Sequence, residues 1–167
     1  MAVTSCEFLT RNLGAFEHLI WSTDQWTPRH FVFVARIEGG SISVDHVHRA
    51  LLAVQRRHPA LRAAIDLDSH GHPRFVPADF PIRLCIVERA GDTQWRSEVE
   101  LQLQNPFPAG HGPLLRTTLV RGESVSELIL AAHHSIGDGI SAMFLVRDLV
   151  ESLEGHAIEQ LPARPCL

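Results

Sequence analysis

The sequence predicts a single α/β domain in which helices pack against a mixed β-sheet. Strand-like segments occur in pairs separated by short turn sequences, and helical segments lie between the pairs. Hairpins place neighbouring strands antiparallel, so this order favours an α/β sandwich over a doubly wound parallel sheet. The chain has 167 residues, of which 45% are hydrophobic, and this is enough to bury the core of one compact domain.

The individual elements follow from the spacing of apolar residues. Recurrence every three or four positions predicts the helices, which are residues 15–21, 43–57, 92–104 and 139–153. Short alternating or continuous apolar runs predict the strands, which are residues 31–37, 61–67, 75–76, 82–87, 114–120 and 125–132. Turn sequences at residues 68–73 and 121–124 join two pairs of these strands as hairpins.

Cap and stop residues mark the helix ends. Ser43 is suited to be the N-cap of the second helix, and His58-Pro59 stops it. Gly155 follows the last helix, and a proline-containing extended stretch comes after it. We therefore expect residues 1–154 to form the folded unit and residues 155–167 to be a linker that leads onward.

The composition excludes several classes of function. The formal net charge is −4 and the pI is about 6.2, whereas nucleic-acid binding needs a clustered basic surface. All fifteen basic residues are arginine, which excludes Schiff-base lysine chemistry and the lysine of a P-loop. Tyrosine is also absent, so no tyrosine can serve as an acid or an oxyanion donor.

Cysteine usage and the first residues indicate a cytoplasmic protein. Cys6, Cys85 and Cys166 are scattered and odd in number, so neither a disulfide framework nor a zinc–cysteine site is expected. Residues 1–10 lack the basic region and the apolar stretch of a signal peptide. No apolar run approaches the length that a membrane span needs, so no transmembrane segment is expected.

The most informative segment is His133-His134-Ser135-Ile136-Gly137-Asp138-Gly139. Apolar runs precede and follow it, which places it at a strand-to-helix turn. Imidazole titrates near neutral pH, so a histidine held rigidly at such a turn can take a proton from a hydroxyl or an amine. Because side chains alternate along a strand, His133 and His134 are expected to point to opposite faces.

These residues resemble the HHxxxDG signature of the acyltransferase superfamily that contains condensation domains, polyketide-associated acyltransferases and alcohol acetyltransferases. Three further segments are similar to the superfamily in the same order: residues 11–17 (RNLGAFE), 57–62 (RHPALR) and 112–116 (GPLLR). The first of them resembles the opening of the alcohol acetyltransferase branch. The resemblance implies a chloramphenicol-acetyltransferase-like two-layer α/β sandwich, of which this chain corresponds to the N-terminal half.

The resemblance also implies roles for single residues. His134 would be the catalytic general base, and His133 would support the motif through structural hydrogen bonds. Asp138 would be a buried anchor paired with Arg62, because a buried carboxylate needs a cationic partner. Gly139 lacks a Cβ, which would let a pantetheine arm approach the backbone. No tightly bound cofactor and no metal are implied, and the co-substrate would be acyl-CoA or a phosphopantetheine thioester.

Simpler interpretations of the same residues stay open. Asp138 can be a helix N-cap or the orienting carboxylate of a Ser-His-Asp triad, and Gly139 can be an ordinary turn glycine. Ser135 lacks the sequence context of a serine nucleophile. A metal site is disfavoured because His134 and Asp138 would share a face only on a continuous helix, which Gly137 interrupts.

The expected function is therefore transfer of an acyl group from a thioester to an alcohol or an amine, with a preference for ester formation from residues 11–17. The expected partner is the C-terminal half of the same enzyme, in the same chain or in a separate polypeptide, and an acyl carrier protein is a second candidate. One alternative is a noncatalytic half-domain that serves as an interaction module. Another is a fragment of a peptide-bond-forming condensation domain.

Overall fold

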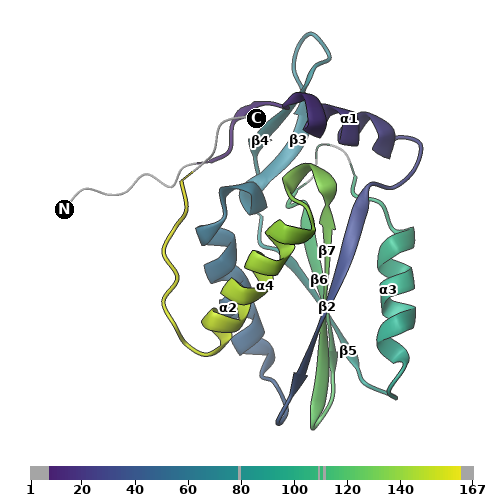
Figure 1. Ribbon diagram of the computed structural model, residues 1–167, viewed down its shortest axis with the longest axis vertical. Helices are drawn as coiled ribbons and strands as arrows, with labels where there is room; N and C mark the ends of the chain where they lie inside the picture. The colour runs from purple at the N-terminus through teal and green to yellow at the C-terminus, as the bar shows by residue number, and fades with distance from the viewer. Residues whose placement is uncertain (1–7, 79, 109, 111, 163–167) are drawn as a thin grey trace, which may run out of the picture.

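The computed structural model describes residues 8–78, 80–108, 110 and 112–162 as an α/β fold (Figure 1). The elements in chain order are β1 (Arg11–Asn12), α1 (Ala15–Asp24), β2 (His30–Glu38), α2 (Val44–Arg57), the 3-10 helix η1 (Pro59–Arg62), β3 (Ala63–Leu67), β4 (Pro73–Pro77), β5 (Arg83–Glu88), α3 (Gln94–Gln104), β6 (Leu115–Arg121), β7 (Val125–His133), the 3-10 helix η2 (His134–Ile136) and α4 (Gly139–Leu153).

Two sheets organise these strands. The larger sheet has the order β2-β7-β6-β5, and it is mixed because β5 runs parallel to β6 while the other pairs are antiparallel. The smaller sheet has the order β1-β4-β3. His133 is the last residue of β7 and lies opposite His30, the first residue of β2. The motif therefore begins where β7, an inner strand of the larger sheet, ends.

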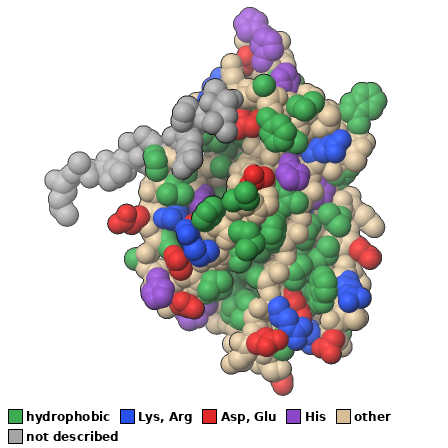
Figure 2. Space-filling model, in the orientation of Figure 1, with side chains coloured by type: hydrophobic (Ala, Val, Ile, Leu, Met, Phe, Trp, Pro, Cys, Tyr) green, Lys and Arg blue, Asp and Glu red, His purple; other side chains and the backbone are tan. Residues whose placement is uncertain are grey.

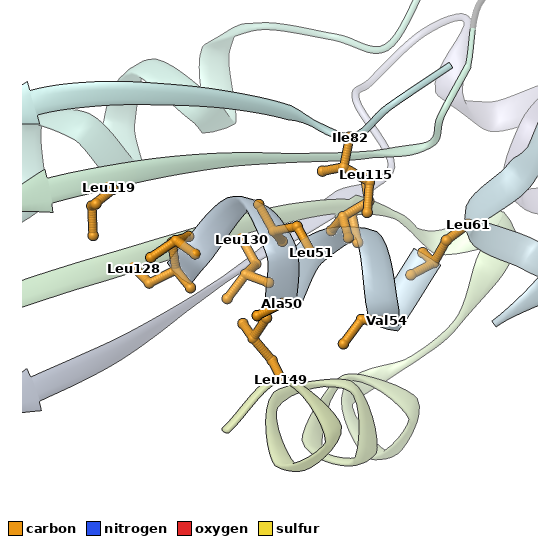
Figure 3. Close-up of a cluster of buried hydrophobic side chains, with 12 residues drawn as sticks. Ala50, Leu51, Val54, Leu61, Ile82, Leu115, Leu119, Leu128, Leu130 and Leu149 are labelled. Carbon is orange, nitrogen blue, oxygen red and sulfur yellow. The ribbon is translucent and has the colours of Figure 1, made fainter. Parts of the chain in front are cut away.

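Helices cover both faces of the larger sheet (Figure 1). Helices α2 and α4 pack on one face, and the main hydrophobic cluster lies between them and the sheet (Figure 3). This cluster contains Val47, Ala50, Leu51 and Val54 of α2, Leu115 and Leu119 of β6, Leu128 and Leu130 of β7, and Leu149 of α4. Helix α3 contacts the opposite face, where Gln102 Nε2 donates a hydrogen bond of 3.1 Å to Thr118 Oγ1.

The strands and helices expected from the sequence are confirmed with small shifts at their ends. Both expected hairpins are present, formed by β3 with β4 and by β6 with β7. Helix α1 continues to Asp24, three residues beyond the expected end, and the short strand β1 was not expected. Ser43 occupies the N-cap position of α2, although its side chain makes no cap hydrogen bond.

The apolar recurrence that predicts α3, carried by Trp95, Val99 and Leu103, does not correspond to a fully buried face. Trp95 and Val99 are half-buried, but Leu103 is 46% exposed, and no residue of the helix is fully buried. Polar contacts to the sheet replace the expected apolar stripe, because Gln102 also accepts from Arg116 Nε at 2.6 Å. Helix α3 is therefore held by hydrogen bonds at its C-terminal end.

Residues 11–17 connect β1 to α1 and are joined by a cluster of hydrogen bonds. The two terminal nitrogens of Arg11, Nη1 and Nη2, donate to the two carboxylate oxygens of Glu17 at 2.6 and 2.7 Å. Glu17 also accepts from the amide of Gly14, the N-cap residue of α1, at 2.7 Å. The arginine and the glutamate of this segment therefore dock α1 onto the smaller sheet.

The chain after α4 turns back along α2 (Figure 1). Gly155 adopts a φ of +87°, which a helix-terminating glycine allows, and the Leu161 amide donates to the Arg57 carbonyl at 2.8 Å. The described segment thus returns to the C-terminal end of α2, and the boundary at residue 155 stays a prediction. No helix in the described ranges has the length and hydropathy to cross a membrane.

Candidate active site

The motif forms a tight turn between the central strand and α4. β7 lies between β2 and β6, and its last residue, His133, donates its amide to the Leu114 carbonyl at 3.0 Å. The His134 amide donates to the Arg29 carbonyl at 2.9 Å. Backbone hydrogen bonds to the residues directly before β6 and β2, the two strands that flank β7, therefore fix the positions of both histidines.

His134 opens the 3-10 turn η2 and is half-buried. Its ring lies 4.5 Å from the ring of Phe31, centroid to centroid, and its Nδ1 lies 3.3 Å from the Gly137 carbonyl oxygen. A carbonyl can only accept, so this contact places the proton on Nδ1. The lone pair of Nε2 is then the basic site of the ring.

His133 is 3% exposed, and its contacts are on the other side of the turn. Its Nδ1 accepts the Ser135 amide at 3.1 Å, and its Nε2 lies 3.5 Å from a carboxylate oxygen of Asp24. Burial lowers the pKa of His133, although the Asp24 carboxylate opposes this effect. Burial and the Ser135 amide, which needs an unprotonated Nδ1, favour the neutral form of His133 within the fold.

Asp138 is exposed, which contradicts the expectation that it is a buried anchor paired with Arg62. It is the N-cap of α4, and its carboxylate accepts from the amide and the hydroxyl of Ser141, both at 2.8 Å. These bonds lower the pKa of the Asp138 carboxyl. Among the described residues, the structure contains no ion pair between Asp138 and Arg62, and the Asp138 carboxylate instead caps α4 through Ser141.

Arg62 ends η1 and is 4% exposed, with its guanidinium carbon 4.8 Å from the ring centroid of Phe8. Its carbonyl accepts the amide of Ala78 at 2.9 Å. Gly139 starts α4 with open space around it, because a Cβ there would meet no atom within 4 Å. This space is compatible with a close approach of a substrate to the backbone.

The buried carboxylate of α4 is Asp148, which sequence reasoning missed. It is 1% exposed and accepts from Arg57 Nε at 2.6 Å, from His58 Nε2 at 2.8 Å and from Arg147 at 2.8 Å. Burial alone would raise the pKa of the Asp148 carboxyl, but these hydrogen bonds outweigh burial and lower it. Asp148 thereby links α4 to the end of α2, directly before η1.

Three cavities border the turn, with volumes of about 70, 200 and 260 Å³. The smallest is lined by Phe31 and Gly137, the second by His133 and Asp24, and the largest by Ser135. Each is smaller than the ~300 Å³ at which small-molecule pockets begin. In the described part of the chain, no group of three or more His, Cys, Asp or Glu residues could hold a metal ion.

The fold defines the class of protein. The condensation domain of the Monacolin K polyketide synthase MokA superimposes with a TM-score of 0.78 over 92% of this chain and 36% of that chain, at 16% identity. The starter condensation domain of the rhizomide synthetase RzmA gives a TM-score of 0.77 over 91% of this chain and 40% of that chain, at 19% identity. The chain therefore has the chloramphenicol-acetyltransferase-like α/β fold of condensation domains, as the sequence predicted.

The sequence comparison gives the family. The family model described as "Condensation domain" matches residues 21–165, and the chain belongs to this family. Phosphinothricin tripeptide synthetase PhsC of Streptomyces viridochromogenes is 34% identical over 159 residues, which are 88% of this chain and 14% of that protein. A linear gramicidin synthase of Brevibacillus parabrevis is 32% identical over 153 residues, which are 85% of this chain and 3% of that protein. The chain thus spans a small part of these relatives.

Proposed function

We propose that the chain supplies the base-bearing half of a condensation site that joins an acyl group to an acceptor. His134 Nε2 takes the proton from the acceptor as the acceptor nitrogen or oxygen attacks the carbonyl carbon of a thioester. The C–S bond then breaks, and the thiolate leaves with the electron pair. The single observation that carries this proposal is the orientation of His134, whose Nδ1 contact to Gly137 leaves Nε2 as the base.

The acceptor that fits best is an amine. Relatives with more than 30% identity include a tripeptide synthetase and a gramicidin synthase by name, so the comparisons favour the peptide-forming alternative over the ester formation expected from residues 11–17. Arg11 and Glu17 of that segment pair with each other, and Glu17 accepts the amide of Gly14 at the start of α1, so both residues have a structural role. The donor in this proposal is an acyl group on a phosphopantetheine thioester or on CoA.

We propose that a C-terminal half covers the side of the site that this chain leaves exposed. Exposed apolar side chains gather on the surface of α4 next to the turn, namely Ile140, Met143 and Phe144, which are 69%, 64% and 52% exposed. Figure 2 shows hydrophobic side chains concentrated on the face where α4 and β2 lie in Figure 1. A second half packed on this surface would bury it and would close the site around His134.

The test compares His134→Ala with His46→Ala, an exposed histidine of α2 that serves as the matched control. The native mass of the purified protein is measured first, to show whether a second polypeptide of similar size is bound. Amide formation between an acyl-pantetheine thioester and an amino-acid thioester is then followed by mass spectrometry. We expect His134→Ala to lose about 10²–10⁴-fold in rate and His46→Ala to keep its rate.

The same pair of variants separates transfer from the interaction-module alternative. A noncatalytic module would keep its partner in both variants and would show no acceptor-dependent product. Equal rates in His134→Ala and in the unsubstituted protein would overturn the proposed role of His134. Free acid formed without an acceptor would instead indicate hydrolysis of the thioester.

A further inference from the structure

Asp24 occupies a position where a carboxylate is unfavourable unless its contacts stabilise it. It is the last residue of α1, and the negative end of the helix dipole disfavours an acidic side chain there. The side chain is nevertheless only 10% exposed, so it does not escape into solvent. Its contacts must therefore compensate for both burial and the helix dipole.

Those contacts lead to both histidines of the motif. The Asp24 carboxylate accepts the backbone amide of Arg29, and the carbonyl of Arg29 accepts the amide of His134 at 2.9 Å. The other carboxylate oxygen of Asp24 lies 3.5 Å from Nε2 of His133. One carboxylate thus holds His133 directly and His134 through a single residue.

The contact with His133 selects one tautomer. Nδ1 of His133 accepts the Ser135 amide at 3.1 Å, so that nitrogen carries no proton and the proton is on Nε2, facing Asp24. If the proton moved to Nδ1, two N–H groups would face each other and the bond to Ser135 would be lost. That bond caps η2, the turn whose first residue is His134.

Aromatic rings flank His133 on the side where Asp24 lies. The ring of Phe107 stands edge-on to the ring of His133, with 6.0 Å between the ring centroids. It is also edge-on to the ring of His30, with 5.8 Å between the centroids. The cavity of about 200 Å³ beside His133 is lined by Trp21, Phe107 and Asp24, among others. Among the described residues, the Asp24 carboxylate is the acidic group of this cavity, so it is the acceptor best suited to the Nε2–H.

We propose that Asp24 is a positioning residue that fixes the tautomer of His133 and holds the turn that presents His134. It does not touch the substrate, and it acts through the Arg29 peptide and the His133 ring. The proposal rests on the proposed function only for the statement that His134 acts on substrate. The positioning role of Asp24 can be tested without measuring turnover. It can therefore fail while the catalytic role of His134 holds, and the reverse is also possible.

The experiment uses NMR on the ¹⁵N-labelled 167-residue chain with Asp24→Ala, Asp24→Asn and the control Glu154→Gln. Glu154 is also a carboxylate at a helix C-terminus, on α4, but it is exposed and remote from the turn. Side-chain ¹⁵N shifts report the tautomer of His133, and hydrogen exchange reports the amides of His134 and Ser135. In Asp24→Ala we expect mixed tautomers and exchange at these two amides that is about tenfold faster or more, while core amides of β6 exchange as before.

Asp24→Asn keeps the size of the side chain and decides the matter if the alanine variant does not fold. In this variant we expect a smaller acceleration at Ser135 and a lower titration midpoint for His133, because the negative charge beside the ring is gone. Unchanged tautomer and unchanged exchange at His134 and Ser135 in a folded Asp24 variant would overturn the proposal. An equal change in Glu154→Gln would overturn it as well.

Discussion

Replacement of Asp148 by asparagine is the sharpest test of how α4 is fixed to the rest of the fold. Asp148 is 1% exposed and accepts hydrogen bonds from Arg57, His58 and Arg147. Asparagine has nearly the same volume but no charge, so the variant leaves Arg57 next to a neutral amide. The packing of the helix is otherwise unchanged.

The magnitude follows from the burial of the pair, in which the Asp148 side chain is 1% exposed and the Arg57 side chain 16% exposed. Breaking a buried ion pair by removing one partner costs about 3–5 kcal/mol, and an asparagine oxygen that keeps one hydrogen bond recovers about 1 kcal/mol of this. We therefore expect a loss of about 2–4 kcal/mol in the free energy of unfolding. For a chain of this size, each kcal/mol lowers the melting temperature by about 2–4 °C.

The assay is urea denaturation followed by circular dichroism, with Glu151→Gln as the control. Glu151 is on the same helix but is 44% exposed and lies 3.7 Å from Arg147, so its loss should change stability by less than about 0.5 kcal/mol. Combining Arg57→Met with Asp148→Leu should cost less than the sum of the two single changes, because neither charge is left alone. If the free energy of unfolding of Asp148→Asn lies within about 0.5 kcal/mol of that of the unsubstituted chain, the interpretation of Asp148 as an anchor is wrong.

Three further outcomes can be checked on the same chain. Burial lowers the pKa of His30, His58 and His133 below the ordinary value of 6.5, so the unfolded chain binds more protons than the folded chain between each lowered pKa and 6.5. The free energy of unfolding should therefore fall as the pH is lowered from about 7.5 to about 5.5, and a flat profile in urea denaturation would contradict this assignment. Leu128→Ala, at a core position with 0% exposure, should cost about 2–5 kcal/mol, and a thermal melt that shows almost no change would contradict the core assignment. Asp138→Ala should cost about 0.5–2 kcal/mol because it removes the N-cap of α4, while Asp138→Asn should cost less, and equal losses in both variants would argue against capping.

Local patterns were sufficient to predict most of the fold. Apolar runs in β6 and β7 and the turn between them predict a hairpin because both signals lie within a few residues of each other. The apolar spacing in α3 did not predict how the helix is held against the sheet. Gln102 of α3 and Arg116 of β6 hydrogen-bond to each other between the helix and the sheet. A polar pair of this kind leaves no periodic apolar signal in the sequence.

In the site, too, features set by neighbouring residues were predicted, whereas a contact between residues far apart in the sequence was not. The turn at His134 follows from its flanking apolar runs, and the structure has it where the sequence placed it. The sequence assigned an arginine–carboxylate pair to Asp138 and Arg62, whereas the structure pairs Asp148 with Arg57. The signal for Asp148 was present, because a carboxylate within an apolar helix requires a cation. Its partner lies 91 residues away in the sequence, and no local spacing connects the two positions.

The return of the chain after α4 also determines where any following polypeptide would be tethered. Helix α4 has 15 residues and carries the chain about 22 Å away from the histidine turn. The hydrogen bond from Leu161 to Arg57 brings the chain back, and Leu161 and Pro162 line the same cavity as Ser135. A domain joined after this segment would start its tether beside the turn, so a short connection would be enough to keep it at high effective concentration there.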